Sequence, residues 1–203
     1  ASIYDGYSTS IGLGTNTLVG GDMELLLDFT DSKNLPKDGT RLQLNNHTFY
    51  NTAEDLDLGG RLDAEAQVYI SAGAKKRITL GLKGGYSQTY GDLPFYQLSS
   101  IGQQSNNRGI RRNRYIGESA AFYNTELRLQ LGRIHNPIIP IRYGVFGLYD
   151  SGRVWFDGET STTWHKSYGG GFYIVPHSES MSLNVTFAHN DKEGSLFSFG
   201  LGA

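Results

Sequence analysis

The chain has 203 residues, among them 27 glycines, 13 tyrosines, 10 phenylalanines and no cysteine. The absence of cysteine excludes disulfides, thiolate metal sites and cysteine nucleophiles within this chain. A formal net charge of −2 gives no bulk electrostatic attraction to nucleic acid. No apolar run approaches the roughly 20 residues of a membrane-spanning helix, and the length suits one domain over residues 1–203.

Segments in which apolar and polar residues alternate recur along the whole chain. In residues 61–72 the apolar parity is Leu62, Ala64, Ala66, Val68, Ile70 and Ala72, and the opposing parity is Arg61, Asp63, Glu65, Gln67, Tyr69 and Ser71. Such alternation predicts strands with one polar and one apolar face. About ten strands are expected, over residues 6–18, 22–32, 39–51, 60–73, 77–91, 119–133, 139–157, 164–176, 180–190 and 195–203.

The predicted strands are long. Many run to about a dozen residues, whereas strands of globular proteins average 5–6 residues and a tilted membrane strand needs about 9–11. An all-β, antiparallel transmembrane β-barrel is therefore expected, with the polar parity facing a wet lumen. The alternative is a soluble β-sandwich or lipocalin-like barrel with the apolar parity inside, because periodicity alone does not distinguish inside from outside.

The one long irregular segment covers about residues 92–118 and contains a basic run around Arg108 and Gly109. Two interpretations stay open. The arginines are solvated at the surface, or Arg108 enters the barrel, where it needs carboxylates to offset its desolvation. Glu126 and Asp150 lie on the polar parity of adjacent predicted strands and are the candidate partners. Gly152 and Gly147 would leave space beside Asp150 for an incoming loop.

Several motifs of the chain occur in a fixed order that resembles the bacterial surface antigen family, the BamA/TamA-type outer-membrane barrels, which are themselves similar to the two-partner secretion pores. The family's sixth extracellular loop carries a Val-Arg-Gly-Phe/Tyr motif, matched at Asn107–Ile110 with only Arg and Gly kept. The family's Arg-aromatic-Ile-Gly follows at Arg114–Gly117, its Glu-Leu-Arg strand at Asn124–Arg128, and its x-Asp-x-Gly strand at Leu148–Gly152. Pro94–Tyr96 matches the family's Pro-Phe-Tyr upstream of the loop.

A weaker similarity lies in an earlier hairpin, at Asp28, Asp31, Pro36 and Gly39. The resemblance implies that Arg108 pairs with Asp150 and Glu126 inside the lumen. Family barrels have about sixteen strands, so the chain is expected to be the C-terminal part of a longer barrel or a shortened barrel that closes with fewer strands.

The resemblance implies a bacterial outer-membrane protein that inserts or translocates outer-membrane proteins without catalysis. The expected partners are outer-membrane lipid (lipopolysaccharide and phospholipid), client β-barrel proteins, and periplasmic or lipoprotein accessory subunits. One alternative is a membrane-anchoring barrel for an N-terminal passenger domain such as a hydrolase. A second alternative is a soluble β-barrel that binds a small ligand.

Catalytic, cofactor and metal sites are not expected. The five histidines are scattered without a metal-ligand spacing. Glu126 and Asp150 could form an acid/base carboxylate pair, but an arginine between them would keep both ionised. The sequence therefore predicts a structural role for these charged residues.

Overall fold

A computed structural model describes residues 17–51, 58–91, 93–102, 106–135, 140–156, 162–176 and 181–202. Nine strands form one antiparallel sheet in the order β1-β2-β3-β4-β7-β8-β9-β10-β11. They are β1 (Leu18–Asp28), β2 (Gly39–Asn51), β3 (Gly59–Ala72), β4 (Ile78–Tyr90), β7 (Ser119–Ile134), β8 (Ile141–Trp155), β9 (His165–Pro176), β10 (Ser182–Asn190) and β11 (Gly194–Gly202). Two short strands, β5 (Ser99–Ile101) and β6 (Tyr115–Gly117), pair with each other between β4 and β7, after the 3-10 helix η1 (Phe95–Gln97).

From β2 onward, every strand of the large sheet lies within two residues of a predicted segment. The predicted strand over 6–18 lies outside the described residues except at its last two positions. The predicted bounds of 22–32 were wrong, because β1 begins four residues earlier and ends at Asp28. There the Asp28 carboxylate accepts a bond from the Thr30 amide at 3.0 Å, and Asp31 accepts one from the Lys37 amide at 2.8 Å, so these side chains close a turn in place of a strand.

The apolar parity of the strands faces outward. On β3, every apolar position from Leu62 to Ala72 is exposed while the opposing positions are half-buried. The same holds at Leu127 on β7 and Leu201 on β11, which are 54% and 76% exposed. A soluble barrel would bury this face, so the membrane-barrel interpretation is confirmed and the soluble ligand-binder is not.

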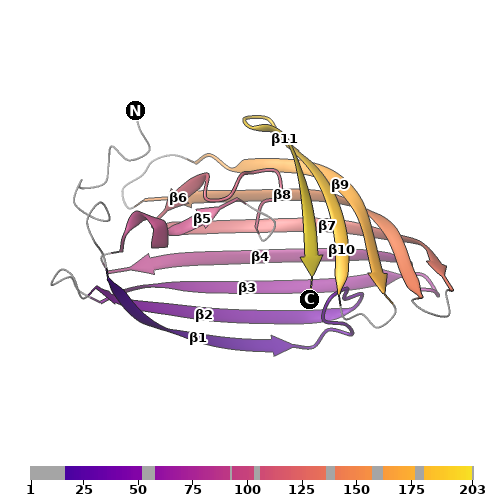
Figure 1. Cartoon of the computed structure of the whole chain (residues 1–203), viewed down its shortest axis with the longest axis horizontal. Helices are drawn as coiled ribbons and strands as arrows, with labels where there is room; N and C mark the ends of the chain where they lie inside the picture. Colours follow the sequence, from indigo (N-terminus) through magenta and orange to yellow (C-terminus); the bar gives the residue numbers. More distant parts are fainter. Residues whose placement is uncertain are drawn as a thin grey trace.

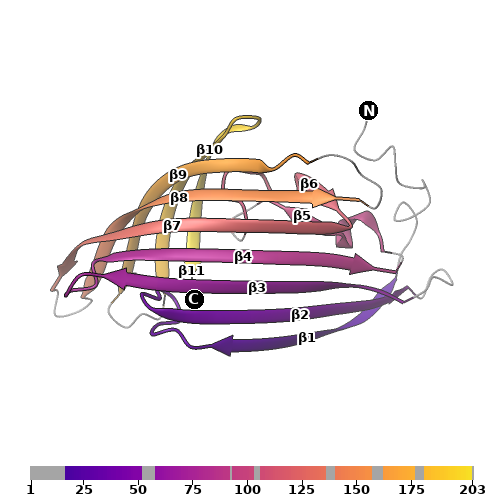
Figure 2. The ribbon, with the colours of Figure 1, turned by 180° about the vertical axis from the view of Figure 1, so that it is seen from behind.

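The sheet curls around a lumen into which two segments fold. Its strands lie nearly side by side from β1 to β8, while β9, β10 and β11 bend across the concave side (Figures 1 and 2). The strand ends that flank residues 52–58, 91–118, 156–164 and 191–193 share one end of the sheet, called here the loop end. Those that flank 29–38, 73–77, 135–140 and 177–181 share the other, the turn end. Among the described residues, no helix is long and apolar enough to cross a membrane.

The sheet is not closed in the part of the chain that the structure describes. β1 and β11 are its two edges, and both run from the loop end to the turn end. Two strands of the same direction do not pair in antiparallel fashion. An antiparallel closure of this sheet therefore needs an odd number of further strands, in keeping with the even strand counts of bacterial outer-membrane barrels.

We expect the destabilisation caused by a charged side chain on β2 to depend on whether that side chain faces the membrane or the lumen. Leu44 is 41% exposed on the outer face, and the next residue, Asn45, lines a polar lumenal cavity of about 290 Å³. We expect Leu44→Arg to lower the free energy of unfolding in lipid vesicles by about 2–4 kcal/mol. Asn45→Arg is the matched control and should cost less than about 1 kcal/mol, because its guanidinium stays in water. Equal costs in denaturant titrations would contradict this assignment of faces.

Candidate functional site

The segment between β4 and β7 enters the lumen because its apolar side chains find a core there. Ile101 of β5 and Ile110 are 0% and 1% exposed and pack with Ala120 at the start of β7. Gly102 turns the chain with a φ of +121°, a conformation that favours glycine. Its amide donates to the Asn106 side chain at 2.9 Å.

A row of three polar residues on neighbouring strands receives the loop. Asn124 of β7 lies directly opposite Asp150 of β8, which lies opposite Ser167 of β9. Asn124 donates to the Asn106 carbonyl at 2.8 Å. Ser167 donates to the Asn107 side chain and accepts a bond from the Gly109 amide at 3.3 Å. Each member of the row thus holds a different part of the loop tip.

Asp150 holds the centre of the loop, at Arg108. Its carboxylate is fully buried and accepts three bonds from Arg108, from the backbone amide at 2.9 Å, Nε at 2.9 Å and an Nη at 2.8 Å. The other Nη donates to Glu126. A guanidinium that is largely out of water thereby meets two carboxylates in a forked geometry, which offsets its desolvation.

Two glycines give the loop the space it needs. A Cβ on Gly109 would lie 2.3 Å from the Ser167 Cβ, so the loop tip approaches β9 only without a side chain. A Cβ on Gly152 would come within 3.2 Å of Ile101, which occupies the space that this glycine leaves on β8. Gly147 does not contribute as expected, because it is exposed on the opposite face of β8.

The loop is also fixed on its return path. The Arg114 guanidinium lies 2.8 Å from the Glu193 carboxylate in the β10–β11 connection. The Tyr115 ring stacks on His165 with 3.7 Å between ring centroids. The segment is therefore joined to β9 and to the last hairpin as well as to β7 and β8.

The structure brings together Arg108, Gly109, Glu126 and Asp150, with Gly152 behind the loop. The sequence did not single out Ser167 or Asn124, because their place beside Asp150 depends on the register between strands. It also gave no role to Arg128, although this residue shares the polar face of β7 with Glu126; its Nε lies 2.6 Å from Glu126.

The arrangement has the chemistry of a structural brace. Arg108 and Arg128 carry two positive charges, and Glu126 and Asp150 carry two negative charges, so the cluster is neutral. Among the described residues, no group of three or more histidine, aspartate or glutamate side chains is placed to hold a metal ion. Glu126 contacts both arginines, and Asp150 contacts Arg108, so each carboxylate is paired with at least one cation.

Comparison with known proteins gives a family and a related barrel. A family model described as the Omp85 superfamily domain matches residues 2–203. The crystal structure of BamA from Haemophilus ducreyi lacking POTRA domains 1–3 superposes with a TM-score of 0.68 at 16% sequence identity. That match covers 89% of this chain and 42% of the BamA chain, so this chain spans less than half the length of its structural relative. No curated protein matches by sequence.

Loss of the Asp150 charge should destabilise the fold strongly. We expect Asp150→Asn to lower the free energy of unfolding by about 3 kcal/mol, because it leaves the buried Arg108 short of a counter-charge. Asp63→Asn is the control. Asp63 also faces the lumen and pairs with Arg61, but it is 27% exposed, so its loss should cost about 1 kcal/mol or less. Denaturant unfolding in detergent measures both, and equal costs would argue against the brace.

Gly109→Ala should displace the loop tip, since the new methyl group meets the Ser167 Cβ. The cost is expected at about 1–3 kcal/mol, read from denaturant unfolding. Adding Ser167→Gly removes that Cβ and should recover part of the loss, although it also removes two loop hydrogen bonds. Gly147→Ala is the control, because its Cβ would have no neighbour nearer than 4.0 Å. Ser167→Gly alone measures the cost of those two bonds, and a double variant whose cost equals the sum of the two single costs would refute the steric explanation.

Proposed function

The chain belongs to the Omp85 superfamily of bacterial outer-membrane barrels, and we propose that it takes part, without catalysis, in inserting or translocating outer-membrane proteins. In such a barrel the short turns face the periplasm and the longer loops face outside. The loop end described above is then extracellular, and Arg108 reaches into the lumen from the outside.

The observation that carries the proposal is the pair of sheet edges. In the described part of the chain, β1 and β11 each pair with one neighbour only. The outer face of β11 carries exposed aromatic and aliphatic side chains, with Phe199 at 72% and Leu201 at 76% exposure. An unpaired strand edge is a template for another strand, and an apolar outer face suits a membrane position for that pairing.

The braced loop supports the same proposal. A sheet that opens at an edge loses the stability that full closure gives a barrel. The contacts of Arg108 with β7 and β8, and of Asn107 and Gly109 with β9, join three central strands from inside the lumen. The middle of the sheet can then keep its curvature while an edge exchanges partners.

The client substrates follow from this reasoning as a chemical class. A client that pairs with a membrane-embedded edge must offer an unpaired strand of its own, with apolar side chains toward lipid. Nascent outer-membrane β-barrels have both properties. Periplasmic or lipoprotein subunits that deliver such clients are the expected accessory partners.

Site-specific photo-crosslinking in the intact outer membrane tests the proposal. A photoreactive residue at Leu25 of β1 or at Phe199 of β11 should capture client barrels. The control is Leu127 in the middle of β7, which is 54% exposed on the outer face, the same fraction as Leu25. Capture at the edges above the level at Leu127 is expected. The alternative, a membrane anchor for a passenger domain, is favoured by two results together. Capture at the edges would not exceed capture at Leu127, and depletion of the protein would leave the levels of outer-membrane proteins unchanged.

A further inference from the structure

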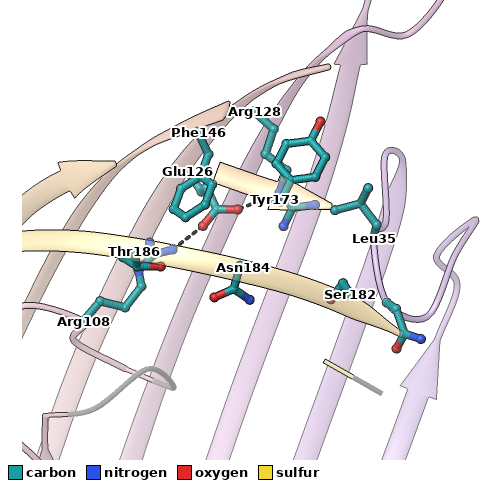
Figure 3. Close-up of a pocket in the computed structure, with 10 residues that line it drawn as sticks. Leu35, Arg108, Glu126, Arg128, Phe146, Tyr173, Ser182, Asn184 and Thr186 are labelled. Atoms are coloured by element: carbon teal, nitrogen blue, oxygen red, sulfur yellow. Dashed lines mark hydrogen bonds and ion pairs between the residues drawn. The ribbon is translucent and has the colours of Figure 1, made fainter. Parts of the chain in front are cut away.

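The connection between β1 and β2, residues 29–38, folds into the lumen from the turn end. Leu35 at its tip is only 8% exposed and belongs to a cluster with Phe146 of β8 and Tyr173 of β9. Figure 3 shows Leu35 on this turn, beside Tyr173 and near Arg128. The apolar side chain of a turn between two strands thus lies inside the lumen, on the side opposite to the Arg108 loop.

Arg128 of β7 joins this turn to the lumen wall. One of its Nη atoms donates to the Pro36 carbonyl at 3.0 Å, next to Leu35. Its guanidinium also lies over the Tyr69 ring, with 5.3 Å from Cζ to the ring centroid. Arg128 therefore uses its several donors and its flat face for three partners, which a lysine at this position would not reproduce.

The third partner of Arg128 is Glu126, which also binds Arg108. Its two carboxylate oxygens are divided between the two arginines, Oε1 for Arg128 and Oε2 for Arg108. All three side chains are mostly buried, with exposed fractions of 15% for Arg128, 19% for Glu126 and 13% for Arg108. In Figure 3 the two arginines lie on either side of Glu126, around a cavity of about 140 Å³.

This chain of contacts connects the two inward segments. It runs from the loop tip at Arg108 through Glu126 and Arg128 to the Pro36 carbonyl of the turn. A mostly buried carboxylate that loses one of its two cations must reorganise toward the other, because its charge remains out of water. A change at either segment therefore alters the environment of the residue that holds the other.

We infer that Arg128 is a positioning residue that holds the β1–β2 turn in the lumen and, through Glu126, couples this turn energetically to the Arg108 loop. The turn and the loop then close the lumen together, one from each end. The inference rests on the contacts alone and does not require that the clients be outer-membrane barrels.

The base of the turn has anchors of its own, so the effect of Arg128 should be confined to the tip. The Ser71 amide donates to Asp38 at 2.9 Å, and the Lys37 ammonium donates to Gln130 at 3.0 Å. Hydrogen bonding from Lys76 holds the pKa of the Asp38 carboxyl below its usual range. These contacts do not involve Arg128 and remain when it is replaced.

The test uses thiol accessibility, because the chain contains no cysteine of its own. Leu35→Cys reports on the turn and Ile110→Cys reports on the loop, each in the complete protein in outer-membrane vesicles. The rate of maleimide labelling is measured for each reporter by the mass of the labelled peptide. Heat-modifiable gel mobility verifies that each variant has folded.

We expect Arg128→Gln to raise the labelling rate at Leu35→Cys roughly ten- to a hundredfold, the effect of losing a charge-assisted hydrogen bond. A smaller increase at Ile110→Cys is expected from the coupling through Glu126. Arg108→Gln should do the reverse, with its larger effect at Ile110→Cys and a smaller increase at Leu35→Cys. Arg128→Lys keeps the charge but not the forked guanidinium, so its labelling rate at Leu35→Cys should fall between those of wild type and Arg128→Gln. This variant replaces Arg128→Gln in the test if Arg128→Gln does not fold.

Lys83→Gln is the matched control, since Lys83 pairs with a different lumenal carboxylate, Glu65, at 2.8 Å. It should leave labelling at Leu35→Cys unchanged. The inference is overturned if Arg128→Gln and Arg128→Lys leave the turn as protected as in wild type. It is also overturned if each arginine affects only its own reporter, because the two segments are then held independently.

Discussion

The buried carboxylate of Asp150 is the constraint from which the rest of this structure follows. It has no exposure to solvent, and one residue, Arg108, donates three hydrogen bonds to it. A charge in that position is tolerable only while its partner is present. The loop between β4 and β7 must therefore stay inside the lumen, and Gly109, Gly152 and the β5–β6 pair are the features that let it do so.

Much of this architecture could be predicted from the sequence, because alternate residues of a strand point to opposite faces of the sheet. The bounds of the large-sheet strands from β2 onward were predicted in this way. Strand length favoured an outward apolar face, and the ordered motifs indicated the family, whereas β5 and β6 fall in a segment that was expected to be irregular. Two further features were not predicted. Ser167 meets the loop only because β9 pairs with β8 in one register, and alternation does not fix register between strands. Residues 29–32 continue the alternation of β1 but turn inward, because Asp28 and Asp31 bind backbone amides.

Direction of the edge strands limits how this sheet can become a barrel. With β1 and β11 both running toward the turn end, the described strands supply an odd number, and antiparallel neighbours at the seam require an even one. Antiparallel closure therefore requires at least one strand beyond those that the structure describes. In this sheet, the central strands are joined by the inward loop and the seam between the edges is incomplete, so two different parts of the sheet would keep its shape and offer edges for pairing. In the proposed function, the lumenal charges hold the shape of the centre, and the edges of the described sheet pair with client strands.

The Arg108 loop and the Leu35 turn both lie in the lumen, and this affects whether a client strand could enter at a sheet edge or pass through the lumen. A strand that enters at an edge meets lipid-facing side chains and backbone groups of β1 or β11, whereas the Arg108, Glu126, Arg128 and Asp150 contacts lie on other strands. A chain that passes through the lumen must instead move both the Arg108 loop and the Leu35 turn, and each move exposes charged groups that are now paired with one another. Breaking one buried pair costs about 3–5 kcal/mol. Because the edge route avoids that cost, these contacts favour, within the function proposed above, insertion of strands at the seam over passage of a chain through the interior.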